Sequence, residues 1–303
     1  MTDAASEWIR QEEAGSIHLI RLMRWLALNA PGAVTDPVIS GIATWYSTWP
    51  GFPAAQASRR FLTHVLGREP RWSERHRHIE TFAHVILERV HLLSDGVDRF
   101  RVEATGQETI ADLHQLGRGG VLLGAHYGSF EALRAFDRSL PGLKVRYLMY
   151  PDNAGKTNQV LGELNPDLAS RVISLAHGPD AMLAVFEVLE RGEFVGFLGD
   201  RVPSAQAKAR VRVRFLDRWI EVPNSPYIAA MAAGVPLILC FAPRLGRHHY
   251  AAEFSMLYDG TPVPRRARDA KVAELAQAYA TALELHCRRD PYNWFNFFDI
   301  WRD

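Results

Sequence analysis

Short apolar runs alternate with longer amphipathic stretches along the second part of this chain. The alternation begins after a glycine-rich turn at residues 117–120, and each apolar run has the length of a buried strand. The runs expected to form strands are residues 121–125, 145–150, 172–175, 194–198, 211–215 and 237–242. The stretches expected to form helices between them are residues 129–138, 179–191 and 224–233. This order predicts an α/β fold with a largely parallel central sheet flanked by helices.

A different pattern, with helical spacing only, occupies the first hundred residues. Helices are expected at residues 15–30, 54–68 and 72–93. We therefore divide the chain into a flexible N-terminus at 1–14, an N-terminal helical segment at 15–100 and an α/β core at 101–303.

The helix expected at residues 15–30 is amphipathic, with leucines and a methionine on one side and a basic opposite side. One interpretation is a helix that packs on its own protein. The other is an anchor in a membrane interface, which the basic side and the nearby Trp25, Trp45 and Trp49 favour. Both interpretations can hold for one helix pair.

The uncharged stretch between Asp36 and Arg59 is too interrupted to cross a bilayer. Prolines and glycines limit its continuous apolar part to about a dozen residues, whereas a membrane span needs about 20. The chain begins with acidic residues and shows no secretory signal. We therefore expect a cytoplasmic protein that lies peripherally on the inner face of the cytoplasmic membrane.

The 35 basic and 34 acidic residues nearly cancel, so no nucleic-acid partner is expected. An anionic partner would need a local patch, and one candidate is the basic cluster at residues 71–78, where cations oppose the dipole of the expected helix. This cluster is either a solvated face or a site for a phosphate or a carrier-protein helix. Two cysteines exclude a disulfide framework and favour a reducing compartment.

The sharpest chemical motif is residues 124–131, GAHYGSFE, in which an apolar strand ends at His126. A turn at Gly128 would let Glu131 fold back toward the imidazole ring. A carboxylate that accepts a hydrogen bond from one ring nitrogen fixes the tautomer and makes the other nitrogen a better base. The alternative is a histidine that satisfies a hydrogen bond in the core.

The segment from His126 to Glu131 resembles the His-x4-Asp/Glu motif of the lysophospholipid acyltransferase superfamily, in the branch that contains the late acyltransferases of lipid A biosynthesis. Similar segments follow downstream, although only the first is highly specific. They are FLGDR at 197–201, Phe215-Leu216 with Pro223, Ala229-Ala230, Gly234-Val235-Pro236 and PYNWF at 291–295. The resemblance extends over about residues 15–303.

The resemblance implies an acyltransferase in which His126 is the general base and Glu131 is its partner. Asp200 and Arg201 would help to shape the acceptor and donor sites. Arg201 suits an anionic headgroup or a phosphopantetheine phosphate, because a guanidinium binds oxyanions through paired donors. The simpler interpretation of Asp200 and Arg201 is an exposed ion pair after a strand.

Two departures from the superfamily narrow the expectation. The Glu-Gly-Thr segment of the glycerophosphate branch is replaced by residues 215–218, FLDR, so a glycerophosphate acceptor is not expected. The long transmembrane helix typical of the lipid A enzymes is also missing, which points to soluble or peripheral relatives.

Other catalytic motifs are weak or missing. Gly155-Lys156-Thr157 imitates the end of a phosphate-binding loop, but the first glycine of that motif would fall at Tyr150. Ser129 is not in a Gly-x-Ser-x-Gly elbow, which disfavours a serine hydrolase. The paired histidines have no plausible companion ligands, so no metal is expected.

We therefore expect an enzyme that moves a fatty acyl group from a thioester to a hydroxyl or amine of a lipid-like acceptor. The donor would be acyl carrier protein or coenzyme A as a co-substrate, with no permanently bound cofactor. Backbone amides of Gly128 and Ser129, at the start of a helix, would stabilise the oxyanion. The alternatives are a thioesterase that uses the same His–Glu pair and a lipid-binding protein in which the histidine is structural.

Overall fold

A computed structural model describes residues 25–301, apart from residues 26, 50, 94, 134–139, 141, 150–170, 175–178 and 203–208. The expected flexible N-terminus, most of the helix expected at 15–30 and the segment at 155–157 lie outside the described residues. The division of the chain at residues 14 and 100 therefore stays a prediction.

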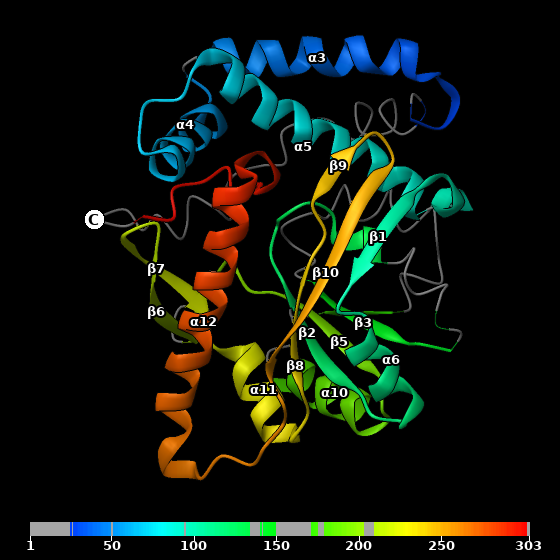
Figure 1. Ribbon diagram of the computed structural model, residues 1–303, viewed down its shortest axis with the longest axis vertical. Helices are drawn as coiled ribbons and strands as arrows, with labels where there is room; N and C mark the ends of the chain where they lie inside the picture. The colour runs from blue at the N-terminus through cyan, green and yellow to red at the C-terminus, as the bar shows by residue number, and fades with distance from the viewer. Residues whose placement is uncertain are drawn as a thin grey trace.

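Three helices form the N-terminal part of the described chain (Figure 1). They are α3 (Gly32–Thr48), α4 (Pro53–Leu66) and α5 (Trp72–Leu93). Helices α4 and α5 match the predicted ones closely, whereas α3 was not predicted because Pro37 and Gly41 interrupt its pattern. Among the described helices, none combines the length and the apolar character needed to cross a bilayer.

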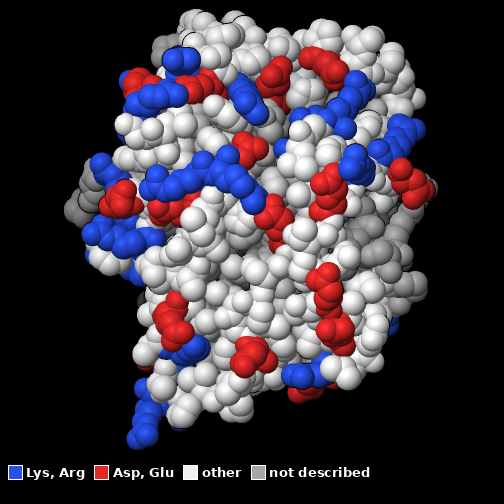
Figure 2. All heavy atoms as spheres, in the orientation of Figure 1, with Lys and Arg blue, Asp and Glu red and all other residues white. Residues whose placement is uncertain are grey.

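Helix α3 lies across one end of the molecule and rests on α5 (Figure 1). Its buried side includes Ile39, which packs against Leu87 and Val90 of α5. The opposite side carries exposed Val34, Val38 and Trp45. Figure 2 shows this end of the molecule as a band almost without charged side chains.

The central sheet has eight strands, with the order β1-β10-β8-β2-β5-β3-β4 and with β9 paired to β10. Neighbours from β8 to β4 are parallel, β1 is parallel to β10, and β10 is antiparallel to β8 and β9. The predicted fold class, a largely parallel sheet flanked by helices, is confirmed. The strands are β1 (Arg101–Thr105), β2 (Gly120–Gly124), β3 (Val145–Met149), β4 (Val172–Ser174), β5 (Phe194–Leu198), β8 (Leu237–Phe241), β9 (Arg244–Gly246) and β10 (His249–Tyr258).

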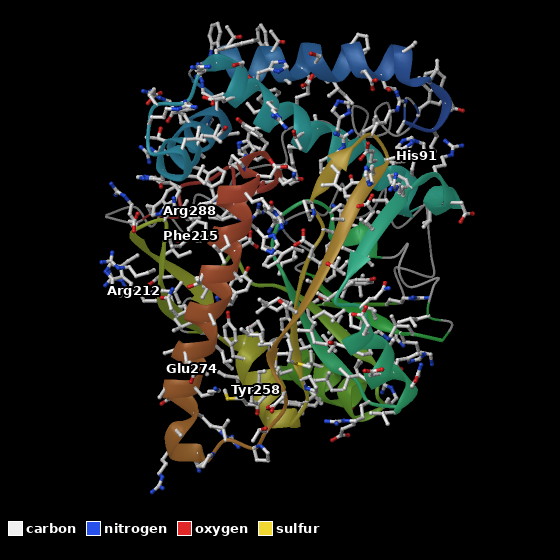
Figure 3. All side chains as sticks on the ribbon, viewed as in Figure 1. His91, Arg212, Phe215, Tyr258, Glu274 and Arg288 are labelled. Atoms are coloured by element: carbon white, nitrogen blue, oxygen red, sulfur yellow. The ribbon has the colours of Figure 1, made fainter. Side chains whose placement is uncertain are left out.

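The strand predicted at residues 211–215 forms, but outside the central sheet. It is β6 (Arg210–Phe215), which pairs with β7 (Arg218–Pro223) in a separate antiparallel hairpin. Figure 3 shows this hairpin beside α12 (Arg268–Arg289). Strands β1 and β10 were not predicted, because neither is an apolar run.

Side chains from alternate positions of the central strands enter two different cores. Val121 and Leu123 of β2 face one core, with α12, α10 (Pro179–Glu190) and α11 (Ser225–Ala233). Leu122 faces the other, with α5 and α6 (Glu108–Gln115). A strand buried on both faces reads as a continuous apolar run, which is why β2 could be predicted from the sequence. Its carboxyl end is therefore held firmly from both sides.

Candidate active site

His126 and Asp200 lie side by side because β2 and β5 are parallel neighbours in register. Gly124 is paired with Leu198, so residues two positions further along each strand reach the same level. The carboxyl ends of adjacent parallel strands are where open α/β sheets usually bind ligands. The expectation that His126 and Asp200 share one edge of the sheet agrees with this geometry.

Asp200 is the carboxylate that orients the imidazole of His126. Nδ1 of His126 lies 2.9 Å from Oδ1 of Asp200, and the backbone N–H of His126 donates to Oδ2 over 3.1 Å. Asp200 is 4% exposed, whereas the side chain of His126 is 31% exposed. Since the carboxylate accepts at Nδ1, Nδ1 carries the proton and Nε2 is left as the basic nitrogen.

Trp294 supplies a third donor to the same carboxylate. Its indole N–H donates to Oδ2 of Asp200 over 3.0 Å, and the indole is fully buried between Phe61 and Phe215. Trp294 follows η7 (Pro291–Asn293), in a segment that pairs with the residues after β2. The N–H of Phe295 donates to the carbonyl of His126 over 2.7 Å. The C-terminal segment thus completes the site, a role that the sequence pattern did not indicate.

His78 of α5 holds the backbone of Trp294 in place. Its Nε2 lies 2.8 Å from the carbonyl of Trp294, and its Nδ1 lies 2.9 Å from the hydroxyl of Ser58. These partners assign the tautomer, because a carbonyl only accepts and so Nε2 must donate. Burial lowers the pKa of His78 to about 4, despite the hydrogen bond to Trp294, which acts in the opposite direction. His78 is therefore neutral in the folded protein.

The buried neutral His78 predicts a loss of stability in mild acid. The unfolded chain takes up a proton below about pH 6.5, whereas the folded chain does so only near pH 4. The stabilisation is fully present above pH 6.5 and falls as the pH decreases toward 4, by up to about 3 kcal/mol. The free energy of unfolding, measured in urea, should decrease between pH 7 and pH 5. This decrease should be smaller by about 2 kcal/mol in His78→Gln than in the parent. The same decrease in parent and variant would contradict this assignment.

Glu131 does not hydrogen-bond to His126, in contrast to the charge-relay prediction. It lies in η2 (Phe130–Ala132), where one carboxylate oxygen accepts from the hydroxyl of Ser129 over 3.1 Å. The other oxygen lies 2.7 Å from Nε of Arg89, close enough for an ion pair although not aligned as a hydrogen bond. Glu131 still lies near enough for its charge to raise the pKa of His126. The ring nitrogen predicted to donate to Glu131 donates to Asp200 instead.

The amides of Gly128 and Ser129, predicted to stabilise an oxyanion, are already used. The N–H of Gly128 donates to the carbonyl of Asn293 over 2.7 Å, and that of Ser129 donates to the carbonyl of Ala242 over 2.9 Å. Gly128 has φ +70°, and a Cβ there would lie 1.7 Å from the Ala242 carbonyl oxygen. Glycine is thus required for the turn. These two residues build the loop of His126, and neither amide is available to substrate.

Arg201 lies beside the pair rather than in an exposed ion pair with Asp200. Its Nη2 donates to the carbonyl of Phe295 over 2.7 Å, and its guanidinium lies over the ring of Phe298. Its Nε is buried and has no hydrogen-bond partner within the described part of the chain. A buried N–H donor that lacks a partner is expensive, so this atom is a candidate contact for an oxygen of the substrate.

Residues 10–303 match the family described as "Bacterial lipid A biosynthesis acyltransferase", which is nearly the whole chain. The chain belongs to this family. It is therefore an acyltransferase, as the resemblance of the His126 segment implied. A search among curated proteins found no significant match.

Electrostatics favour the neutral form of His126 in this acyltransferase. Burial lowers the pKa of His126, and the positive charge of Arg201 lowers it further, against the opposite effect of Asp200. Burial alone would raise the pKa of Asp200, but the interaction with His126, including two hydrogen bonds, and the positive charge of Arg201 outweigh it, so that the pKa lies below its ordinary value. At neutral pH the pair therefore consists of a neutral imidazole and an ionised carboxylate.

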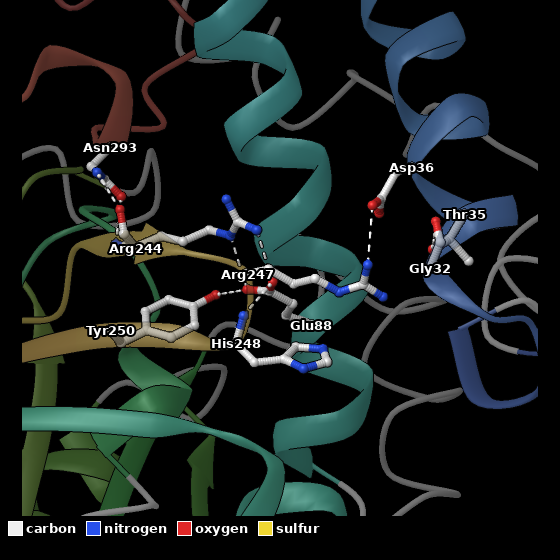
Figure 4. A network of polar contacts seen from close by, with 9 residues as sticks. All are labelled: Gly32, Thr35, Asp36, Glu88, Arg244, Arg247, His248, Tyr250 and Asn293. Carbon is white, nitrogen blue, oxygen red and sulfur yellow. Dashed lines mark hydrogen bonds and ion pairs between the residues drawn. The ribbon is translucent and has the colours of Figure 1, made fainter.

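A buried charge cluster fixes the loop that leads from β8 to the site of the acyltransferase (Figure 4). Glu88 of α5 is 3% exposed and accepts from Nε and Nη2 of Arg244, from the hydroxyl of Tyr250 and from the backbone N–H of His248. The backbone N–H of Arg244 in turn donates to the side chain of Asn293 over 2.8 Å. This cluster ties α5, the β9–β10 hairpin and the C-terminal segment together.

A cavity of about 340 Å³ lies between the start of α3, α5 and the β9–β10 hairpin, and Glu88 is one of its lining residues. Its walls include His84, His91 and His248, and none of its lining residues belongs to the His126 site. The candidate active site is therefore defined by the geometry of His126 and Asp200 and not by this cavity. In the part of the chain that the structure describes, no group of three or more possible metal ligands occurs.

Proposed function

We propose that this acyltransferase moves a fatty acyl group from a thioester onto a hydroxyl or amine of a lipid-like acceptor, with His126 as general base. The observation that carries the proposal is the pair of His126 and Asp200. Asp200 holds the proton on Nδ1, while Nε2 belongs to a side chain that is partly exposed at the carboxyl edge of the sheet. A neutral imidazole in this orientation is suited to remove a proton from an attacking nucleophile.

The reaction needs two proton transfers, one to His126 and one from it. Nε2 of His126 removes the proton of the acceptor as its oxygen or nitrogen forms a bond to the thioester carbonyl carbon. The tetrahedral oxyanion then collapses, the C–S bond breaks, and the imidazolium returns the proton to the leaving thiolate. Asp200 stays ionised and stabilises the imidazolium, as a buried carboxylate does in comparable catalytic arrangements. No acyl-enzyme is needed in this mechanism.

Arg201 is the proposed partner of the oxyanion or of another substrate oxygen. Its charge lies near enough to lower the pKa of His126, and its buried Nε has no partner among the described residues. These two observations support Arg201 in the role for which the sequence suggested Gly128 and Ser129. In this proposal His126 is the base, Asp200 orients its imidazole, and Arg201 stabilises the negative charge on the substrate.

The direct test is an assay of thioester consumption with and without an acceptor. Purified protein is mixed with a fatty acyl thioester on acyl carrier protein or on coenzyme A, and the products are identified by mass spectrometry. Acyl transfer to a lipid acceptor supports the proposal. Release of free fatty acid at the same rate without acceptor would identify a thioesterase, and binding of acyl chains without turnover would identify a lipid-binding protein.

Arg201→Lys is expected to impair the reaction more than folding. Lysine keeps the charge but loses the planar set of donors, so kcat/KM should fall by about tenfold while Tm changes little. A lower kcat would indicate a contact with the oxyanion, and a higher KM would indicate a contact with another substrate oxygen. The assay measures KM and kcat for the thioester and for the acceptor, beside a thermal unfolding curve. Unchanged kcat and KM with a lowered Tm would show that Arg201 only holds the Phe295 carbonyl.

Membrane association is the second part of the proposed function. It rests on the outer side of α3, where Trp45 is 61% exposed and stacks on Trp49, which is 57% exposed. Asp36 is the only charged residue of this helix. Tryptophan side chains favour the boundary between water and lipid, and a large exposed apolar surface needs a partner. We propose that this side of α3 rests on the inner face of the cytoplasmic membrane.

Flotation with lipid vesicles tests this placement. The protein should float with vesicles that contain anionic lipid, and Trp45→Glu combined with Trp49→Glu should reduce the bound fraction by at least about tenfold, because charged side chains are strongly disfavoured below the headgroups. Leu285→Glu is the matched control, since Leu285 is 66% exposed on α12. Equal flotation of the parent and the double variant would contradict the placement.

A further inference from the structure

The outer side of strand β6 carries a row of three arginines. Arg210, Arg212 and Arg214 alternate along the strand with Val211, Val213 and Phe215. The arginines are exposed, and Val213 and Phe215 are buried in the core. Because successive side chains of a strand point to opposite faces, the strand combines one apolar face with one basic face. We call the exposed arginines at 210, 212 and 214 the arginine row.

Two members of the row are held in place by an exposed indole rather than by a carboxylate. The guanidinium groups of Arg212 and Arg214 lie 4.9 and 4.5 Å from the ring centroid of Trp219 on β7. Neither forms an ion pair with Asp or Glu among the residues that the structure describes. Arg210, by contrast, pairs with Glu221 over 2.7 Å. Glu221 lies opposite Arg212 in the hairpin but forms its ion pair with Arg210. Arg212 and Arg214 therefore present two exposed cations that have no ion-pair partner in the described part of the chain.

The strand that carries the arginine row is fixed by contacts to α12 and lies close to His126 and Asp200. The side chain of Gln277 on α12 hydrogen-bonds both the N–H and the carbonyl of Arg214, over 2.8 and 3.0 Å. The inner face of the same strand places Phe215 against Trp294, with ring centroids 5.0 Å apart. Since Trp294 donates to Asp200, the hairpin lies directly behind the catalytic carboxylate.

The shape of the row fits a macromolecule with regularly spaced acidic groups. Alternate residues of a strand are about 7 Å apart, so the three arginines extend over about 14 Å. Carboxylates at positions i and i+4 of a helix are about 6 Å apart along its axis, a spacing that matches the row. A free nucleotide needs a concave site that encloses its base. An exposed hairpin strand provides a docking surface instead.

A membrane is a poorer match for this surface. The uncharged side of α3 lies at one end of the molecule, whereas the β6–β7 hairpin lies lower on the flank beside α12 (Figure 1). In Figure 3, Arg212 is on the outer side of that hairpin. A flat bilayer that touches the outer side of α3 would leave the hairpin open to a protein in solution.

We propose that the arginine row docks an acidic helix of the carrier protein that delivers the acyl thioester. This inference rests on the proposed thioester-dependent transfer and concerns the surface at which the carrier protein docks, not the chemistry of the thioester. Contacts of exposed charges mainly speed up association and are weakened by salt. The row therefore acts in donor selection and takes no part in the chemistry at His126.

The experiment measures binding of purified acyl carrier protein, loaded with a fatty acyl group, to the full chain. A His126→Gln background prevents turnover during the titration. Arg212→Glu combined with Arg214→Glu should raise Kd about tenfold or more at low salt, and the difference should shrink at high salt. Arg212→Gln with Arg214→Gln should give a smaller change in the same direction. For the control assay, either pair of substitutions is made in protein that retains His126. These variants should keep the kcat/KM of the parent for acyl-coenzyme A and its Tm.

The matched control is Arg265→Glu with Arg266→Glu, a second exposed arginine pair, located in η6 (Arg265–Ala267) at the far end of α12. This control should leave Kd for the carrier unchanged. An equal Kd for the parent and the row variants, or no binding of the carrier at low salt, overturns the proposal. Transfer from acyl-coenzyme A would then still support the proposed function. Loss of vesicle flotation without a change in carrier binding would instead assign the row to the membrane.

Discussion

His126→Ala is expected to lower kcat by about 10²–10⁴-fold, the usual contribution of a general base. The side chain is partly exposed, so its removal leaves no large hole in the core. Asp200 would keep two of its three donors, the backbone N–H of residue 126 and the indole of Trp294. The fold should therefore survive, and circular dichroism together with Tm will establish whether it does.

His126→Gln is the companion variant for this measurement. Glutamine can donate to Asp200 from its amide but cannot act as a base near neutral pH. Both variants should lose turnover to a similar extent, although the glutamine variant should be closer to the parent in Tm. Folded protein of either variant with turnover within about threefold of the parent would remove His126 from the mechanism.

Asp200→Asn is expected to lower kcat by about 10²–10⁴-fold as well. The three groups that surround this side chain are all N–H donors, so an amide places its own donor against one of them. The imidazole then loses the carboxylate that fixes its tautomer and stabilises its charged form. Since Asp200 raises the pKa of His126, the acid limb of the pH–rate profile should also move to lower pH in any residual activity.

Glu131→Gln is the comparison that separates the two candidate partners of His126. Glutamine can still accept from Ser129, and only the ion pair with Arg89 is lost. The loss in kcat should stay below about tenfold, because a contact of this kind contributes about 1 kcal/mol. A larger loss for Glu131→Gln than for Asp200→Asn would reverse the assignment and restore the charge relay predicted from the sequence.

The partner of His126 shows where sequence reasoning reached its limit. Glu131 is close in the chain, so a turn was enough to suggest contact, whereas Asp200 is 74 positions away. That contact depends on the register of β2 against β5, which the sequence does not specify. His126 and Asp200 have the same offset of two from the ends of β2 and β5, whereas the predicted runs end at residues 125 and 198 and give offsets of one and two. The shared signal was only that both residues follow an apolar run. It led to the correct edge of the sheet but not to the hydrogen bond.

The fold could be predicted where burial makes the pattern simple. Strands β2, β5 and β8 are apolar on both faces, and their runs stand out in the sequence. Strand β10 mixes alanines with polar residues, and β1 alternates without reaching full burial. The prediction that two backbone amides bind the oxyanion failed because their actual partners are distant in the chain. The amides of Gly128 and Ser129 are taken by carbonyls of Asn293 and Ala242, which are remote in sequence.

The pairing of the C-terminal segment with the loop after β2 has a consequence for biosynthesis. His126 and Asp200 leave the ribosome long before Trp294, which is 94 positions beyond Asp200. Until that indole is present, the carboxylate lacks a donor and the carbonyl of His126 lacks its partner at Phe295. The nascent chain therefore holds His126 and Asp200 in an unfinished arrangement, and we expect activity only after residues 294 and 295 have been added and have paired with the loop after β2. A chain truncated before residue 290 should be inert even where its sheet has formed.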